Sequence, residues 1–210
     1  MNLITPPAEP AASSWNRRFG ADGFLFGDTP NKWLSEHAHA WSPGDRVLAV
    51  ADGEGRNSVW LAGRGLVVDA FDLSEVGVAK ARSLAATKGV NVNFAVADCD
   101  TLAWPSAQYD GVAAIFVQFA DPAMRERLFA NIIRSLKPKA TLILLGYTPR
   151  QHDYRTGGPA IASHLYTEPM LRHAFAALDI VKLHEYDDDL EEGSAHRGRL
   201  ALIGLVATKR

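Results

Sequence analysis

Two glycines in a short turn are the residues of this chain that point most directly to a chemical role. Gly53 and Gly55 follow an apolar run, residues 47–51, and a helical pattern over residues 58–62 comes directly after them. Glycine lets the backbone approach a ligand closely, and the start of a helix offers N–H groups without partners inside the helix. This order predicts a nucleotide-binding turn, although an ordinary tight turn between a strand and a helix has the same pattern.

The residues around the turn indicate which nucleotide it binds. A dinucleotide-binding turn needs a third glycine three residues after the second, and Ser58 stands there, which argues against a dehydrogenase. Asp52 and Glu54 in the turn repel a pyrophosphate but suit a ligand that carries an ammonium and a sulfonium. Asp72 ends the second apolar run, where a carboxylate can accept both hydroxyls of a ribose, or merely cap a helix. S-adenosylmethionine (SAM) meets both requirements.

Composition sets broad limits on the class of protein. The chain has 210 residues, 47 % of them hydrophobic, and a net charge of −2, so one domain without a nucleic-acid partner is expected. The single cysteine, Cys99, cannot form an internal disulfide, which fits a reducing cytoplasm. No apolar run approaches the length of a membrane span, and residues 1–14 lack the pattern of a signal peptide. We therefore expect a cytoplasmic protein with no membrane partner, either a monomer or a homodimer.

The chain before the first core strand divides into two parts. Residues 1–14 are rich in proline, alanine and serine, and are expected to form a disordered tail. Residues 15–41, with a helix expected over residues 31–40, contain six large aromatic side chains: Trp15, Phe19, Phe24, Phe26, Trp33 and Trp41. This aromatic leader is expected to form a lid over a cofactor, or else to pack beneath the sheet. The remaining residues, 42–210, would be the cofactor-binding domain.

Strands and helices alternate from residue 46 onward. Strands are expected at residues 46–51, 66–71, 91–97, 111–117 and 141–146, and helices at residues 57–62, 75–88 and 122–136. Ser74 and Gly89 are expected to cap the second helix, and Asp121 with Pro122 to begin the third. Such alternation predicts a mostly parallel sheet that is covered on both faces.

The pattern changes after Gly146. A long loop, residues 147–164, precedes a helix whose N-cap is expected at Thr167. Two further strands are expected at residues 180–186 and 200–208, joined by an acidic turn over residues 187–199. These two strands are predicted to form an antiparallel pair at the edge of the sheet.

With the elements placed, the chain resembles the class I SAM-dependent methyltransferases, and within them the tellurite-resistance methyltransferase type and its bacterial relatives. The resemblance covers nearly all of the chain from Trp15. Its motifs are residues 53–62, Asp72-Leu73-Ser74, Ile115-Phe116, Leu136-Lys137-Pro138, and residues 146–151, 154–159 and 192–198. It implies an α/β, Rossmann-like fold: a seven-stranded, mostly parallel sheet with helices on both faces and an antiparallel edge strand.

The resemblance also implies roles for individual residues. The cofactor would be held by Ala51, Asp52, Gly53, Gly55, Asn57, Asp72, Leu73, Asp98, Cys99 and Ile115. Asp98 would bind the adenine amino group, unless it is a plain strand-end residue, and Cys99 would be a small space-filling residue and not a reactive thiol. The substrate would lie against Gln118, Tyr147, Tyr154 and Thr156. No metal ligand set is expected.

Some positions depart from the family pattern. Ala49 replaces the usual acidic residue of the first strand, and Ala51 replaces the usual first glycine of the turn. Alanine avoids positive φ, so Ala51 restricts the turn, and Asp52 is a candidate to replace the missing carboxylate. Gln118 stands where the relatives often have histidine, which puts a general base at that position in doubt.

His196 and Arg197 are the candidate catalytic residues that the resemblance implies. A histidine can take a proton near neutral pH, and a guanidinium can hold an anion. The alternative is a turn pair that balances the acidic residues 187–192. The expected reaction is methyl transfer from SAM to a small nucleophile: a thiol, a chalcogen oxyanion or an amine. Two alternatives stay open, a protein lysine methyltransferase and a SAM-binding module without catalysis.

Overall fold

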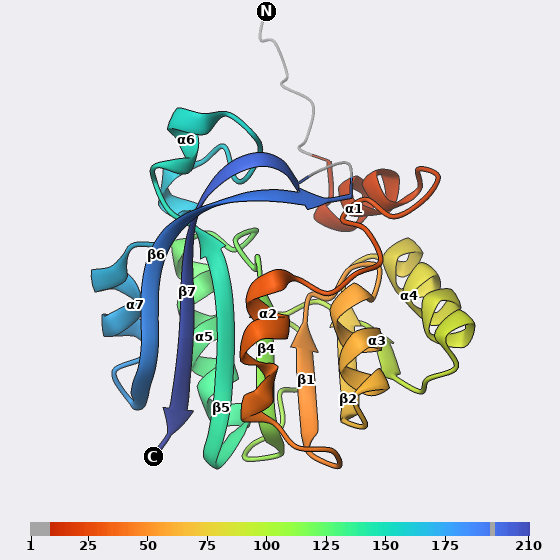
Figure 1. The fold of residues 1–210 in the computed structure, drawn as a ribbon, viewed down its shortest axis with the longest axis horizontal. Helices are drawn as coiled ribbons and strands as arrows, with labels where there is room; N and C mark the ends of the chain where they lie inside the picture. Colours follow the sequence, from red (N-terminus) through yellow and green to blue (C-terminus); the bar gives the residue numbers. More distant parts are fainter. Residues whose placement is uncertain (1–8, 194–195) are drawn as a thin grey trace, which may run out of the picture.

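A single seven-stranded sheet organises the chain. The computed structural model describes residues 9–193 and 196–210, and for His196 the backbone only. The strands lie in the order β3-β2-β1-β4-β5-β7-β6 (Figure 1). Their bounds are β1 (Arg46–Val50), β2 (Val67–Asp72), β3 (Asn93–Val96), β4 (Tyr109–Ile115), β5 (Leu136–Tyr147), β6 (Leu178–Glu192) and β7 (His196–Lys209).

Strands β1 to β5 run parallel, and β7 is antiparallel to both of its neighbours, β5 and β6. The prediction of a mostly parallel sheet is therefore confirmed. The predicted antiparallel pair at the edge of the sheet is also confirmed: β6 and β7 are its last two strands, with β7 between β5 and β6, which leaves β6 outermost. A hairpin turn returns the chain beside the strand it has just left, so the last strand fills the space that β6 leaves free.

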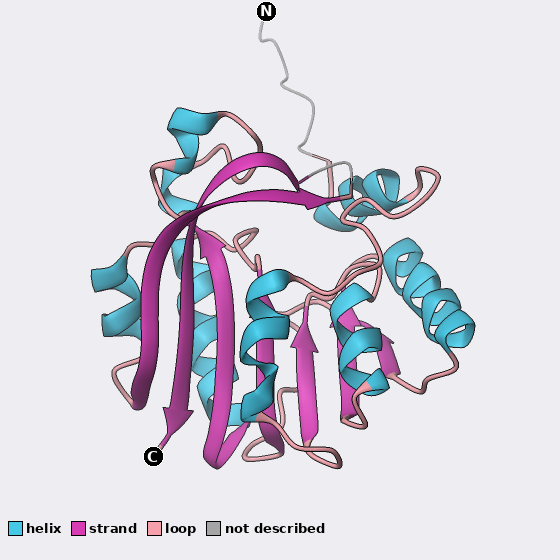
Figure 2. Ribbon diagram, in the orientation of Figure 1, coloured by secondary structure: helices cyan, strands magenta, loops and turns pink. Residues whose placement is uncertain are grey.

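Helices cover both faces of the sheet, as Figures 1 and 2 show. Their bounds are α1 (Ala11–Phe19), α2 (Lys32–His37), α3 (Arg56–Gly63), α4 (Glu75–Lys88), α5 (Pro122–Ser135), α6 (Gln151–Tyr154) and α7 (Glu168–Ala174), with 3₁₀ turns at Ala38–Ala40 and Ala162–His164. The caps fall where the sequence places them: side-chain oxygens of Ser74, Asp121 and Thr167 accept the N–H groups that begin α4, α5 and α7.

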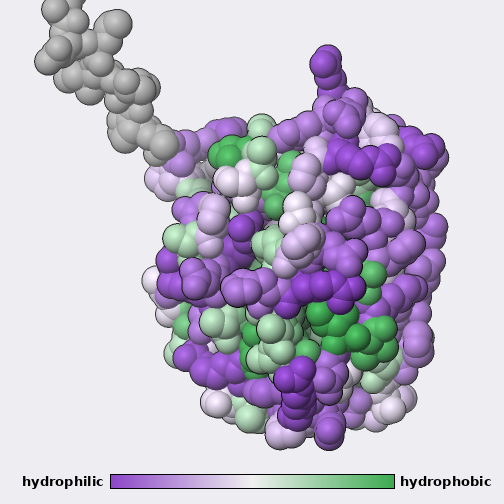
Figure 3. Space-filling view, turned by 90° about the vertical axis from the view of Figure 1, so that its left-hand side faces the viewer, coloured by the Kyte–Doolittle hydropathy of each residue, from purple (hydrophilic) through white to green (hydrophobic). Residues whose placement is uncertain are grey.

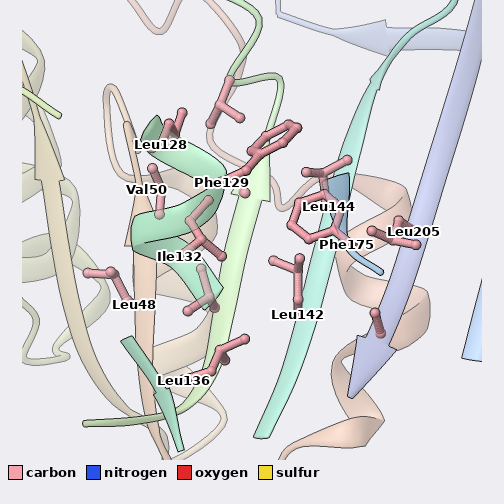
Figure 4. Packing of buried hydrophobic residues seen from close by; sticks show 14 of the residues in the cluster. Leu48, Val50, Leu128, Phe129, Ile132, Leu136, Leu142, Leu144, Phe175 and Leu205 are labelled. Carbon is pink, nitrogen blue, oxygen red and sulfur yellow. The ribbon is translucent and has the colours of Figure 1, made fainter. Parts of the chain in front are cut away.

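Two apolar clusters lie on opposite faces of the sheet, because successive side chains of a strand point to opposite faces. Val47 belongs to the cluster under α2 and α3, whereas Leu48 belongs to the cluster under α5 and α7. Figure 4 shows the second cluster, in which Leu128 and Ile132 of α5 lie beside Leu142 and other strand residues. Burial on both faces explains the continuous apolar runs of the central strands.

The tail predicted over residues 1–14 is too long. Residues 1–8 lie outside the described residues, but α1 begins at Ala11, directly after Pro10. Two alanines open this helix, and Phe19 at its end is buried, so tertiary packing fixes a segment that composition alone suggests to be disordered.

The last two strands are longer than predicted. The expected acidic turn, residues 187–199, is mostly strand: β6 continues to Glu192 and β7 starts again at His196. In Figure 1 this hairpin bends over the carboxyl ends of the parallel strands toward α1. Figure 3 shows the face that carries β6, which is largely hydrophilic with separate hydrophobic patches. No helix in the described part of the chain is long and apolar enough to cross a membrane.

Candidate functional site

A cavity of about 310 Å³ lies at the carboxyl ends of the parallel strands, beneath α1. Ligands of open α/β sheets bind at this edge, and the volume is in the range of small-molecule sites. Residues after β1, β2, β3 and β4 line it, together with residues of the leader: Ala11, Trp15, Phe19, Phe26, Ala51, Asp52, Gly53, Arg56, Asn57, Phe71, Asp72, Leu73, Ala97, Asp98, Cys99, Asp100, Ile115, Phe116, Phe119 and Met124.

The glycine turn after β1 has the geometry that its sequence predicts. Gly55 has φ +89°, and a Cβ atom there would lie 2.6 Å from Cβ of Ala81 in α4, so only glycine fits. Ala51 also lies in the left-handed region, with φ +49°. The backbone thus keeps the shape that a glycine would give it, at a steric cost to the alanine.

Asp52 faces the cavity and caps the helix behind the turn. Its carboxylate accepts hydrogen bonds from the backbone N–H and the hydroxyl of Ser58 in α3. Burial raises the pKa of Asp52 to about 7, with a further increase from Asp72, while the bonds from Ser58 and the charge of Arg56 oppose this rise. Asp52 therefore combines a place on the cavity wall with a carboxyl group whose pKa is raised by burial.

Asp72 lies at the end of β2 and connects the two ligand-facing turns. One of its carboxylate oxygens accepts the N–H of Gly53 at 2.9 Å, and the other accepts the N–H of Ser74 at 2.8 Å. Burial raises the pKa of Asp72, and these backbone bonds oppose the rise. The residue that was predicted to bind a ribose thus lines the cavity in a fixed orientation.

The predicted adenine contacts also lie on the cavity wall. Asp98 follows β3, and its Oδ1 accepts the N–H of Asp100 at 2.8 Å. Burial raises the pKa of the Cys99 thiol to about 12, which makes the thiolate scarce and fits a space-filling role. Leu73 and Ile115 line the cavity beside them.

Glu54 is oriented differently from the sequence-based expectation. Its carboxylate accepts the N–H of Leu25 at 2.7 Å and the ammonium of Lys80 at 3.0 Å, and it does not line the cavity. Glu54 therefore fastens the leader to the turn and to α4. Of the two acidic residues in the turn, only Asp52 lines the cavity.

A buried ion pair joins three distant segments behind the cavity. Arg56 in α3 pairs with Glu192 at the end of β6, with 2.8 Å between Nη2 and Oε2, and donates a second bond to the carbonyl of Phe26. Glu192 also accepts the side-chain amide of Asn31, whose backbone N–H donates to Asn57. The predicted cofactor residue Asn57 is thus held by the leader as it lines the cavity.

The leader and the hairpin touch at two glycines. A Cβ atom on Gly193 would lie 2.4 Å from the backbone nitrogen of Gly27, so the two backbones pack directly against each other. The far end of the hairpin between β6 and β7 is therefore packed against the leader.

The four predicted substrate residues lie outside the cavity wall. Gln118 is buried, and its amide bonds to the backbone of Tyr147 and His164. Tyr147 is itself buried, Tyr154 donates to Asp187 at 2.8 Å, and Thr156 donates to the carbonyl of Arg199 at 2.6 Å. These contacts hold the loops together, and a direct role of the four residues toward substrate stays a prediction.

The predicted catalytic pair lies at the hairpin. Arg197 is exposed, does not line the cavity, and donates from Nε to the carbonyl of Gly193 at 2.9 Å. The side chain of His196 lies outside the described residues, so its predicted role stays a prediction. Among the described side chains, which exclude that of His196, no group of three could hold a metal ion.

Sequence reasoning missed part of the cavity wall. Phe116 and Phe119, from the segment between β4 and α5, and Met124, in the first turn of α5, also line the cavity. Phe116 has φ +57°, which is rare for a bulky residue. No sequence pattern predicts this conformation of Phe116, because it depends on the contacts of the neighbouring loop.

Comparison with known proteins agrees with this architecture. Residues 47–139, less than half of the chain, match the family model described as a methyltransferase domain. No curated protein matches the sequence.

Three solved structures illustrate the similarity. One comes from work on the conversion of a disulfide bond into a thioacetal group during echinomycin biosynthesis (TM-score 0.77, 16 % identity, covering 94 % of this chain and 92 % of that one). Another is the N-methyltransferase NodS from Bradyrhizobium japonicum with S-adenosyl-L-homocysteine (SAH), which has a TM-score of 0.73 and 12 % identity and covers 96 % of this chain and 99 % of that one. A third is TehB from Haemophilus influenzae, which has a TM-score of 0.70 and 16 % identity and covers 95 % of this chain and 67 % of that one. At these identities the likeness shows the fold, and the predicted methyltransferase fold is confirmed.

Proposed function

We propose that this protein is a SAM-dependent methyltransferase that acts on a small-molecule nucleophile. The observation that carries the proposal is the cavity at the carboxyl ends of β1, β2 and β3, where the N–H of Gly53 donates to the carboxylate of Asp72. The match to a methyltransferase domain covers these residues, and a structural neighbour binds SAH, which supports SAM as the cofactor. The tellurite-resistance type suggested by the sequence belongs to this broader proposal of a small nucleophile, within which the paired state of Arg56 favours an uncharged acceptor over an oxyanion.

The residues present fit this cofactor. Gly53 of the turn and three carboxylates, Asp52, Asp72 and Asp98, line the same cavity. Carboxylates accept hydrogen bonds from ribose hydroxyls, an ammonium group or an adenine amino group, but they repel a pyrophosphate.

The protein's part in methyl transfer is alignment and the exclusion of water. SAM supplies a methyl group already activated by positive sulfur, so no obligatory catalytic dyad is required. The leader places Trp15, Phe19 and Phe26 over the cavity, and we propose that it acts as the predicted lid. His196 and Arg197 remain proposed auxiliary residues at the hairpin, for deprotonation and for orienting an anion.

The acidic segment gives no support to a lysine methyltransferase. Asp187 accepts Arg150 and Arg199, Asp188 pairs with Lys32, and Glu192 is buried with Arg56. These carboxylates are occupied within the chain, which leaves less acidic surface to attract a basic protein. Labelled SAM added to cell lysate distinguishes the two acceptors, since methylated protein bands would contradict the small-molecule proposal.

A SAM-binding module without catalysis is the other alternative. Its main support was the altered turn, but Ala51 takes positive φ and the turn keeps its shape. Such a module would bind SAM without ever converting it to SAH in the presence of acceptors.

The first experiment is the melting temperature with SAH, with SAM and with NAD. A ligand at 100 times its Kd adds about 2.7 kcal/mol to the free energy of unfolding, which raises Tm by roughly 5–10 °C for a chain of this size. We expect this rise with SAH and SAM and none with NAD.

A matched pair of variants tests the site itself. Asp72→Asn should lose most of the SAH-induced rise, because loss of a charged hydrogen-bond acceptor costs about 1.5–3 kcal/mol. Asp69→Asn, on the same strand but bonded to Arg46 outside the cavity, should keep it. The proposed function is wrong if the wild type shows no rise with SAH or SAM.

A further inference from the structure

The cavity has two chemically different sides. We call the first the acidic wall: Asp52, Asp72, Asp98 and Asp100, from the ends of β1, β2 and β3. The second, the aromatic wall, consists of Trp15 and Phe26 from the leader, Phe116 and Phe119 from the segment between β4 and α5, and Met124 from the first turn of α5. In the proposed function the polar groups of the cofactor belong to the acidic wall, which leaves the aromatic wall for the methyl acceptor.

The β4 side of the aromatic wall is rigid and strained. Phe116 holds its left-handed conformation with an N–H bond to Leu145 at 2.8 Å, and its ring stacks on Tyr147 with 4.7 Å between centroids. Gln118 fixes the same loop through three bonds to the backbone of Tyr147 and His164. Strain of this kind persists only where the surroundings enforce it, and it concentrates at functional sites. The position of the Phe116 ring is therefore set before a ligand binds.

The leader side is also packed. Trp15 stacks on Phe19 with 5.2 Å between ring centroids, and Phe19 meets Phe26 edge to face at 6.3 Å. Phe19 is 2 % exposed and lies against the turn at Gly53. This contact connects the leader's aromatic side chains to the cofactor turn.

The charge of the cavity disfavours an anionic acceptor. Arg56 is the one basic residue among the described residues of its lining, and its guanidinium is paired with Glu192 and bonded to Phe26. Arg18 lies outside the lining, with its guanidinium over the Trp15 ring at 4.1 Å. Asp100 is itself paired with Arg127. Three other carboxylates, Asp52, Asp72 and Asp98, therefore share the lining with one neutralised cation, and a chalcogen oxyanion or a carboxylate would meet repulsion.

Resting on the proposed function, we infer that the methyl acceptor is a flat, apolar molecule with an uncharged amine or ring nitrogen. Its body lies between the aromatic residues of the leader and Phe116 with Phe119. The nitrogen lone pair attacks the methyl carbon, the bond from carbon to sulfur breaks, and the positive charge moves from sulfur to nitrogen. The methylated nitrogen then releases its proton, where it has one, to water. Aromatic faces and nearby carboxylates stabilise a cation at each stage, whereas they gain nothing from an anion.

Binding to the SAH-loaded protein tests this inference. The probes are 5-aminoquinoline, its thiol analogue 5-mercaptoquinoline, the anion quinoline-5-carboxylate, and selenite, each titrated by calorimetry at pH 8. We expect the amine to bind at least tenfold more tightly than the carboxylate, and selenite not to bind. With SAM in place of SAH, the amine should give N-methylated product and an equal amount of SAH.

A pair of truncations locates the acceptor. Phe119→Ala removes an aromatic side chain that is 37 % exposed, and should weaken 5-aminoquinoline about tenfold while the affinity for SAH changes less than twofold. Val181→Ala, at a 69 % exposed position of β6 that does not line the cavity, should change neither.

The outcomes separate this inference from the proposed function. The inference is overturned if SAH binds but selenite, the carboxylate or the thiol binds better than the amine, if no probe binds, or if Phe119→Ala has no effect. Failure of SAH and SAM to bind the wild type overturns the proposed function, and the inference with it.

Discussion

The acidic wall and the aromatic wall line one cavity but are built in different ways. Side chains of the acidic wall are held by the strand-end turns: Asp52 by Ser58, Asp98 by Asp100, and Asp72 by Ser74 and by Gly53 of the neighbouring turn. The aromatic wall draws on segments that are about a hundred residues apart, since Trp15 and Phe26 of the leader line the same cavity as Phe116 and Phe119.

The difference separates the cofactor from the acceptor. A wall made of strand ends and tight turns forms whenever the sheet forms, and such turns suit a cofactor that many proteins share. The aromatic wall depends on the leader, which is fixed by the buried pair of Arg56 and Glu192 and by Glu54. Substitutions in the aromatic wall can therefore alter which acceptor binds while the cofactor turn stays the same.

The largest expected effect comes from breaking the buried ion pair. Glu192→Ala leaves the Arg56 guanidinium buried without its carboxylate, at 7 % side-chain exposure, and should lower the free energy of unfolding by about 3–5 kcal/mol. Urea denaturation measures this loss. Glu191→Ala, at the exposed neighbour, should cost less than about 0.5 kcal/mol.

The same variant tests the division between the walls. Material that remains folded should still bind SAH, because the acidic wall does not depend on Glu192, but it should bind 5-aminoquinoline more weakly. Equal loss of both affinities would mean that the two walls form one unit.

An effect of similar size, spread over several pH units, is expected from the titration of Asp52 in the acidic wall. Its pKa rises from 3.8 in the unfolded chain to about 7 in the fold, so between these values the unfolded chain gives up its proton first. The contribution of Asp52 to stability is thus complete below pH 4 and is lost as the pH rises to about 7, at up to about 1.4 kcal/mol per pH unit.

Comparison of variants isolates this contribution. The difference in free energy of unfolding between the wild type and Asp52→Asn, measured in urea from pH 4 to pH 8, should follow that slope. Asp100→Asn should not remove it, since Arg127 lowers the pKa of Asp100. An unchanged slope in Asp52→Asn would show that the buried position of Asp52 does not control its titration.

The smallest effect is expected at the turn itself. Ala51→Gly removes the steric cost of φ +49°, which is about 1 kcal/mol, but adds backbone entropy to the unfolded chain. The net change in the free energy of unfolding should be a gain of no more than about 1 kcal/mol, with SAH affinity retained. A clear loss of stability, measured in urea, would mean that the alanine side chain makes a contact that outweighs its strain.

The sequence by itself determined the alternation of strands and helices, the caps at Ser74 and Asp121, and the turn at Gly53 and Gly55. It also placed Asp72 on the cavity, because the end of the second strand lies beside the end of the first in any sheet of this kind. These features depend on local patterns and on the parallel order of neighbouring strands, both of which are readable along the chain.

The directions of the acidic and aromatic side chains depend on packing between elements. Glu54 stands two residues after Asp52 in the turn, yet it binds Lys80 and the leader, because α4 places the Lys80 ammonium beside it. The strained Phe116 and the length of the hairpin to Glu192 likewise follow from partners far away in sequence. Local propensity specifies single elements, whereas such contacts exist only after the elements have packed together. The aromatic leader was therefore visible in the sequence, but the part of the aromatic wall that follows β4 was not.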